Sequence, residues 1–149
     1  MKKRIEQLNA LSLEEWRLLL FAMVLLPLVA LSLRMRGFKR TQNSMRRFVP
    51  KESDYFETGM NELNRARIIS RMVAVAGSHG LYRANCLKQS LVLWWLLSRS
   101  RIKSEIVFGI QKEAVEDFSA HAWVECDGIN LSDSKEIQQR FAEFQKSSE

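Results

Sequence analysis

Three side chains of the types that carry out acyl transfer occur in the order Cys86, His121, Asp133. His121 comes 35 residues after Cys86, and Asp133 comes 12 residues after His121. A thiolate can attack a carbonyl carbon, an imidazole can take and return the proton, and a carboxylate fixes which ring nitrogen carries hydrogen. These residue types predict a nucleophile, a general base and an orienting acid.

Cys86 opens a segment that is apolar over 91–97 and predicts a helix from Cys86 to about Ser98, with Asn85 as its N-cap. A thiol in the first turn lies at the positive end of the helix dipole, which favours the thiolate. Taken alone, a Cys beside Leu87 and Leu91 is more often a small buried hydrophobe than a nucleophile. The presence of His121 and Asp133 favours the nucleophile.

His121 begins an alternating segment, 121–126, that is followed by Asp127-Gly128 and predicts a β-hairpin. A two-residue turn would place His121 opposite Ser134. A three-residue loop, 126–128, with Gly128 left-handed would instead pair His121 with Asp133. We favour the three-residue loop, because the face that carries the chemistry would then also present an apolar floor to the Cys86 helix, made by Trp123, Ile129 and Leu131.

Two further carboxylates, Asp117 and Asp127, are alternatives for orienting His121. The donor for an oxyanion is less directly indicated, because no Gln lies between Gln42 and Gln89. The backbone N–H of Cys86 is the first candidate, since helix-start amides point at that space, and Asn85 and Tyr82 are further candidates.

The remaining pattern predicts mostly helices before Cys86 and strands after it. We expect a helix over 13–33 that is kinked or split at Pro27, a basic linker over 40–50, and a helix over 61–76 with Leu63, Ile68, Ile69, Met72 and Val75 near its inner face. Further along we expect a strand over 104–110, a loop over 111–120, and a helical tail over 134–149 with Ile137, Phe141 and Phe144 at helical spacing.

The charge of the chain is concentrated at its front. Residues 1–52 hold 11 Lys and Arg against 4 Glu, whereas the rest of the chain is close to neutral. A basic cluster over 34–47 follows the uncharged segment Leu18–Leu33, as in a segment at an anionic membrane surface or against an acidic partner. A solvated charged face is an equal alternative. Sixteen residues with a proline are too few for a typical span, so we read the segment as buried or interfacial, with a transmembrane anchor as the alternative.

These motifs resemble the leader peptidases of lasso-peptide biosynthesis, a branch of the transglutaminase-like cysteine proteases. The likeness rests on Cys86-Leu87-Lys88-Gln89-Ser90-Leu91, on Ile106-Val107-Phe108-Gly109, on His121-Ala122-Trp123-Val124-Glu125, and on the front segments 11–17 and 25–28. The resemblance implies an α+β, papain-like core in which the catalytic helix packs on a small antiparallel sheet behind N-terminal helices. It assigns Cys86 as nucleophile, His121 as base and Asp133 as orienting carboxylate.

The resemblance also implies a role in the cell. We expect residues 1–50 to form an apolar helix and basic linker and residues 51–149 to form the catalytic domain. The expected activity is removal of a leader from a ribosomally made precursor, with a separate small leader-recognition protein as partner and a lasso cyclase acting on the product. No cofactor, metal or nucleic acid is expected. Two Cys without a secretory signal favour reduced thiols in the cytoplasm, with membrane contact through residues 16–47 as an addition.

Three other readings compete with the peptidase. His79, Cys86, His121 and Cys126 could bind zinc, although none of them is paired at the short spacing typical of structural sites. A catalytically inactive transglutaminase-like module could serve as a binding protein. A transamidase would use the same thioester and differ only in whether an amine or water resolves it.

Overall fold

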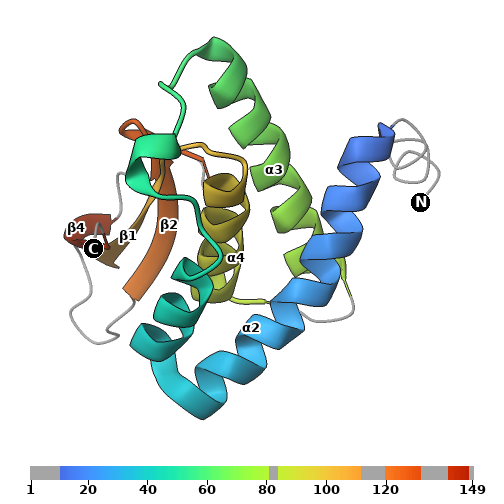
Figure 1. The fold of residues 1–149 in the computed structure, drawn as a ribbon. Helices are drawn as coiled ribbons and strands as arrows, with labels where there is room; N and C mark the ends of the chain where they lie inside the picture. The colour runs from blue at the N-terminus through green and yellow to red at the C-terminus, as the bar shows by residue number, and fades with distance from the viewer. Residues whose placement is uncertain (1–10, 81–83, 112–119, 132–140, 148–149) are drawn as a thin grey trace.

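In the part of the chain that the structure describes, three helices lie on one side of a four-stranded antiparallel sheet. The computed structural model describes residues 11–80, 84–111, 120–131 and 141–147. The elements are α2 (Leu13–Arg46), a 3-10 turn (Glu52–Asp54), α3 (Met60–His79), α4 (Cys86–Arg99), β1 (Glu105–Gln111), β2 (Ala120–Cys126), β3 (Ile129–Asn130) and β4 (Phe141–Ser147). Helix α4 lies between the sheet and the α2–α3 pair, so the predicted α+β class is confirmed (Figure 1).

Helix α2 begins where the sequence predicts and continues further than expected. Ser12 and Glu15 form a capping box, in which each side chain accepts from the other residue's backbone N–H. The helix is not split at Pro27, which lies inside α2. The non-helical backbone is at Gly37, where φ is 76°, a value that a glycine adopts without the steric cost of a side chain.

The segment after Gly37 is helical and packed, which corrects the prediction of a linker over 40–50. Thr41 and Gln42 are buried, and the Trp95 indole N–H donates to the Met45 carbonyl over 3.1 Å. Phe38 meets Phe108 edge to face with centroids 5.5 Å apart. The basic segment therefore folds back on α4 and the sheet, because its few apolar and amide groups find partners there that sequence periodicity does not indicate.

Helices α3 and α4 agree closely with their predicted ranges. Leu63, Ile69 and Met72 of α3 are buried as expected, whereas Ile68 is 38% exposed and lies off the inner face. In α4 every residue from Ser90 to Ser98 is buried, because this helix meets α2, α3 and the sheet at once. Nearly continuous burial explains why its sequence is apolar all round.

The strand order is β3-β2-β1-β4, with all neighbours antiparallel. The helical tail predicted for 134–149 is wrong for 141–147, which pair with β1 as β4. Residues Phe141 and Phe144 fit a helical spacing, but backbone pairing with the edge of β1 determines the structure there. This is the usual way in which tertiary context overrides local preference in strands.

Candidate active site

Cys86 is the first residue of α4, as the sequence predicts. Asn85 has an extended backbone, and its side chain accepts from the Lys88 N–H over 3.3 Å, so it is the N-cap. The Cys86 side chain is half-buried. The thiol therefore lies beside backbone N–H groups that have no partner within the helix, at the end where the helix dipole favours negative charge.

The structure brings Cys86 and His121 together where the start of α4 meets the start of β2. A hydrogen bond with the His121 side chain is the largest influence on the Cys86 thiol and lowers its pKa below the ordinary value of 9.0. Burial raises that pKa, and backbone hydrogen bonds with Ala122 and Leu87 lower it further. The net lowering makes the thiolate, which is the nucleophilic form, more available near neutral pH.

A serine one turn into α4 ties the helix to the strand that carries His121. The Ser90 hydroxyl, 2% exposed, donates to the Ala122 carbonyl over 3.0 Å. Sequence reasoning named Ser90 only as part of a motif and gave it no role. The available signal was a hydroxyl residue directly before the apolar run 91–97, since a buried hydroxyl must find a partner.

The surroundings of His121 come from the sheet. His121 is opposite Gly109 of β1, and its ring lies over that of Trp123 with centroids 6.2 Å apart and planes 26° apart. Trp123 is itself buried and donates its indole N–H to the Glu125 carboxylate over 2.9 Å. His121, Trp123 and Glu125 thus form a row on one face of β2, in which Trp123 lies against the imidazole and Glu125 holds Trp123.

The hairpin differs from the one predicted. Cys126 pairs with Ile129 and Glu125 with Asn130, so the turn has two residues, and the three-residue loop is wrong. Both turn residues have positive φ, 51° for Asp127 and 74° for Gly128, which is the Asp-Gly turn whose twist suits a tight hairpin. Gly128 is left-handed as expected, but Asp127 shares that conformation and removes the need for an extra residue.

The face of β2 that packs on α4 is also the opposite of the predicted one. Ala122, Val124 and Cys126 belong to the core cluster that contains α4, with Leu131 packed against it. Trp123 is buried on the other face. In the observed register the apolar floor and the His121–Trp123 row are on different sides of the strand.

The predicted orienting carboxylate, Asp133, lies outside the residues that the structure describes, and so does its alternative Asp117. Tyr82, a candidate for the oxyanion, also lies outside them. Asp127 is six positions along from His121, about 20 Å at 3.3 Å per residue, so it cannot orient the ring. The Leu131 N–H donates to the Val124 carbonyl over 2.9 Å, so the strand pairing set by the two-residue turn continues to Leu131, two residues before Asp133. This pairing gives no support to the predicted pairing of Asp133 with His121.

The four residues of the zinc reading do not form a common site. Cys126 is buried, and burial raises its pKa, with a hydrogen bond from Thr58 as a smaller opposing influence. The His79 ring contacts the Ser78 hydroxyl at 2.7 Å. Among the described residues, which include all four, no three His, Cys, Asp or Glu side chains are grouped so that they could hold a metal ion.

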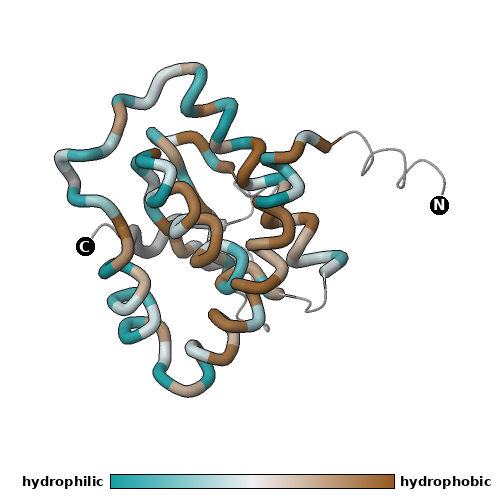
Figure 2. The backbone as a smooth tube through the Cα atoms, turned by 45° about the vertical axis from the view of Figure 1, so that its right-hand side comes forward, coloured by the Kyte–Doolittle hydropathy of each residue, from teal (hydrophilic) through white to brown (hydrophobic). Residues whose placement is uncertain are grey.

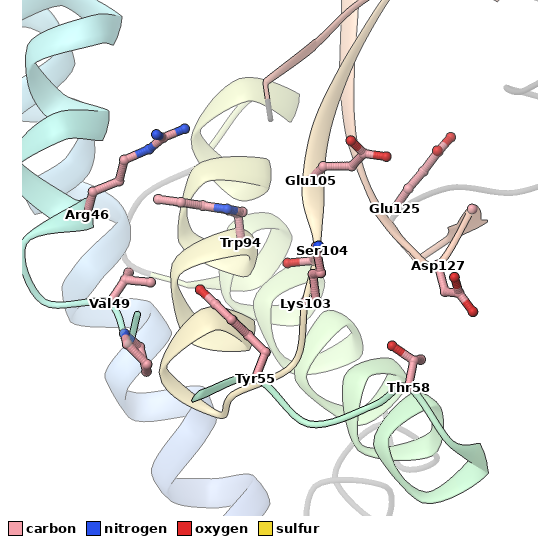
Figure 3. A pocket seen from close by; sticks show the side chains of 12 residues that line it. Arg46, Val49, Tyr55, Thr58, Trp94, Lys103, Ser104, Glu105, Glu125 and Asp127 are labelled. Atoms are coloured by element: carbon pink, nitrogen blue, oxygen red, sulfur yellow. The ribbon is translucent and has the colours of Figure 1, made fainter. Parts of the chain in front are cut away.

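A separate cavity of about 550 Å³ lies at the opposite end of the sheet from His121. Figure 3 shows Arg46, Tyr55 and Trp94 on one wall and the carboxylates of Glu105, Glu125 and Asp127 on the other. Trp94 is eight residues after Cys86 on α4, about 12 Å along the helix axis. This cavity is therefore distinct from the Cys86–His121 pair.

A thiol at a helix start beside an imidazole on an antiparallel sheet is an arrangement suited to cysteine-dependent acyl transfer. The family model described as "Transglutaminase-like superfamily" matches residues 23–146, and the chain belongs to this superfamily. The match begins inside α2 and ends in β4, so it includes every element that positions Cys86 and His121. Comparison with curated proteins and with solved structures gave no match.

Proposed function

We propose that this chain is a cysteine endopeptidase that removes the leader from a ribosomally synthesised precursor during lasso-peptide maturation. The observation that carries the enzymatic part is the hydrogen bond between the Cys86 thiol and His121 at the start of α4. A buried structural cysteine has no need of a lowered pKa, and Cys126 of the same chain has a raised one. The lasso-peptide assignment is supported by the sequence motifs around Cys86, His121 and the front helix.

In the proposed reaction the Cys86 thiolate attacks the carbonyl carbon of the bond after the leader, with its proton held by His121. Collapse of the tetrahedral intermediate breaks the C–N bond, and His121 returns the proton to the departing amine of the core peptide. Water, deprotonated by His121, then hydrolyses the thioester and releases the leader as a carboxylate. Asp133 is proposed to orient His121, and the backbone N–H of Cys86 to stabilise the oxyanion.

The proposed partners follow from the same resemblance. In the described residues ahead of Cys86, the regular elements are helices and a 3-10 turn, apart from the isolated bridge at Phe56. A winged-helix module with three strands is therefore not formed by residues 11–80, which supports recognition of the leader by a separate small protein. A lasso cyclase that consumes ATP would join the freed amine to an Asp or Glu side chain. The location proposed for these steps is the cytoplasm.

The test is incubation with a candidate precursor peptide and recognition protein, followed by mass spectrometry. We expect two fragments whose masses sum to that of the precursor plus one water. Cys86→Ala should abolish cleavage while Cys126→Ala, the matched control, retains it, with folding verified by circular dichroism. An amide product linked to an added amine would indicate a transamidase. No product with any precursor, together with retained peptide binding, would indicate an inactive binding module.

A further inference from the structure

The outward face of α2 is an uninterrupted apolar stripe. Leu13, Trp16, Leu20, Val24, Leu28, Leu31 and Met35 recur every three or four residues, and each is at least 38% exposed. At 1.5 Å per residue the stripe is about 33 Å long. Phe21, 50% exposed, widens it. Contiguous apolar patches above about 300–600 Å² mark interaction sites, and eight large side chains at these exposures exceed that range.

The opposite face of α2 is already occupied. Leu19, Ala22, Leu26 and Val29 are buried in the core with α3 and α4. By length and composition α2 could cross a membrane, and 22% of its apolar window is buried. Because one side of the helix packs on the protein core, α2 in this fold can lie along a surface but cannot be surrounded by lipid.

A basic hollow follows the stripe directly. The left-handed Gly37 turns the chain back and sets Arg36 beside Arg40 and Arg47, which line a hollow of about 410 Å³ with Asn43 and Ser44. The three arginines are exposed. Figure 2 shows the change: hydrophobic colouring recurs along α2 to the turn at the bottom of the view, and hydrophilic residues dominate the segment that returns.

We propose that this face of α2 docks the protein on an anionic phospholipid bilayer, with the apolar stripe in the interface and the arginine hollow on lipid phosphates. The lack of hydrogen-bonding groups favours lipid over a protein partner. Apart from the Trp16 indole N–H, the side chains of the stripe have no N–H or O–H group, whereas protein interfaces normally provide a hydrogen bond per 100–200 Å². Exposed arginines next to an apolar helix face that carries a tryptophan suit a helix lying on an anionic bilayer.

The experiment is flotation of the full-length protein with phosphatidylcholine vesicles, with and without phosphatidylglycerol. We expect the wild type to float with the mixed vesicles and much less with the neutral ones. The variant Leu20→Gln/Val24→Gln should reduce partitioning by at least about tenfold. The variant Arg36→Gln/Arg40→Gln should lose about fivefold per arginine, on the anionic vesicles only.

A matched control keeps the result specific. Met60→Gln removes an apolar side chain that is 71% exposed at the start of α3, away from the stripe, and should float like the wild type. A wild type that stays in the soluble fraction, or a Leu20→Gln/Val24→Gln variant that floats unchanged, would overturn the proposal. Self-association without lipid that this double variant abolishes would also overturn it, because the stripe would then bind a second copy. Vesicle binding is independent of cleavage, so it tests this proposal separately from the peptidase.

Discussion

Ser90 is expected to position the nucleophile, and its removal gives the sharpest test of the site. Ser90→Ala deletes the 3.0 Å hydrogen bond to the Ala122 carbonyl and leaves that carbonyl, in a residue 4% exposed, without this donor. An unsatisfied buried acceptor costs about 1–3 kcal/mol. For a chain of this size we expect Tm to fall by about 2–4 °C for each kcal/mol.

The larger effect should be on reactivity. Ala122 adjoins His121, and Ser90 is one turn from Cys86, so this bond fixes the distance between the thiol and the imidazole. A displacement of about 1 Å can cost on the order of 100-fold in rate. We therefore expect cleavage by Ser90→Ala to fall by about 10- to 100-fold, and the pH profile of Cys86 alkylation to move toward that of an ordinary thiol.

Ser70→Ala is the matched control, because Ser70 is 7% exposed and its hydroxyl donates to the Leu131 carbonyl of the same hairpin over 2.5 Å. It should lose similar stability, measured by urea unfolding, while keeping the alkylation profile of the wild type. If Ser90→Ala shows the same stability loss but the alkylation profile and cleavage rate of Ser70→Ala, the positioning argument is refuted.

Four further predictions concern the thiols and two glycines. Iodoacetamide should modify Cys86 at least about tenfold faster than Cys126 near neutral pH, because the pKa of Cys86 is lowered and Cys126 is buried with a raised pKa; equal rates would contradict this. Since the folded pKa of Cys86 is the lower one, its thiolate should stabilise the fold fully above pH 9.0 and lose that effect as pH falls through the folded value, measured by urea unfolding of wild type against Cys86→Ala. Gly128→Val should lower the free energy of unfolding by about 1–2 kcal/mol or more through its positive φ alone, because no atom lies within 4 Å of an added Cβ. Gly128→Asn should lower it clearly less, and equal losses would show another cause. Gly80→Ala should destabilise by about 1–3 kcal/mol, because its Cβ would lie 2.3 Å from the Ala76 carbonyl oxygen, and an unchanged Tm would show that the chain relaxes there.

Features set by neighbouring residues were predictable from the sequence. The start of α4 at Cys86, the Asn85 cap, the Ser12–Glu15 capping box and the left-handed Gly128 all depend on contacts within about one turn of the chain. Such contacts form wherever the local chemistry permits, so residue type and spacing determine them. The superfamily could also be predicted, since its motifs around Cys86 and His121 lie at these locally determined positions.

Features that join distant segments required the tertiary structure. Asp127 as well as Gly128 adopts positive φ, which gives the two-residue turn that Asp-Gly pairs favour. The three-residue loop was preferred for the face it would present to α4, and only the packing of β2 on α4 shows that the other face is used. The tail at 141–147 becomes β4 because the edge of β1 is open to pairing, despite a helical spacing of aromatics. The Cys86–His121 hydrogen bond and the Ser90 anchor likewise arise only when α4 packs on β2. In each case the free energy comes from burial and pairing between elements, and a local sequence pattern does not encode the partner.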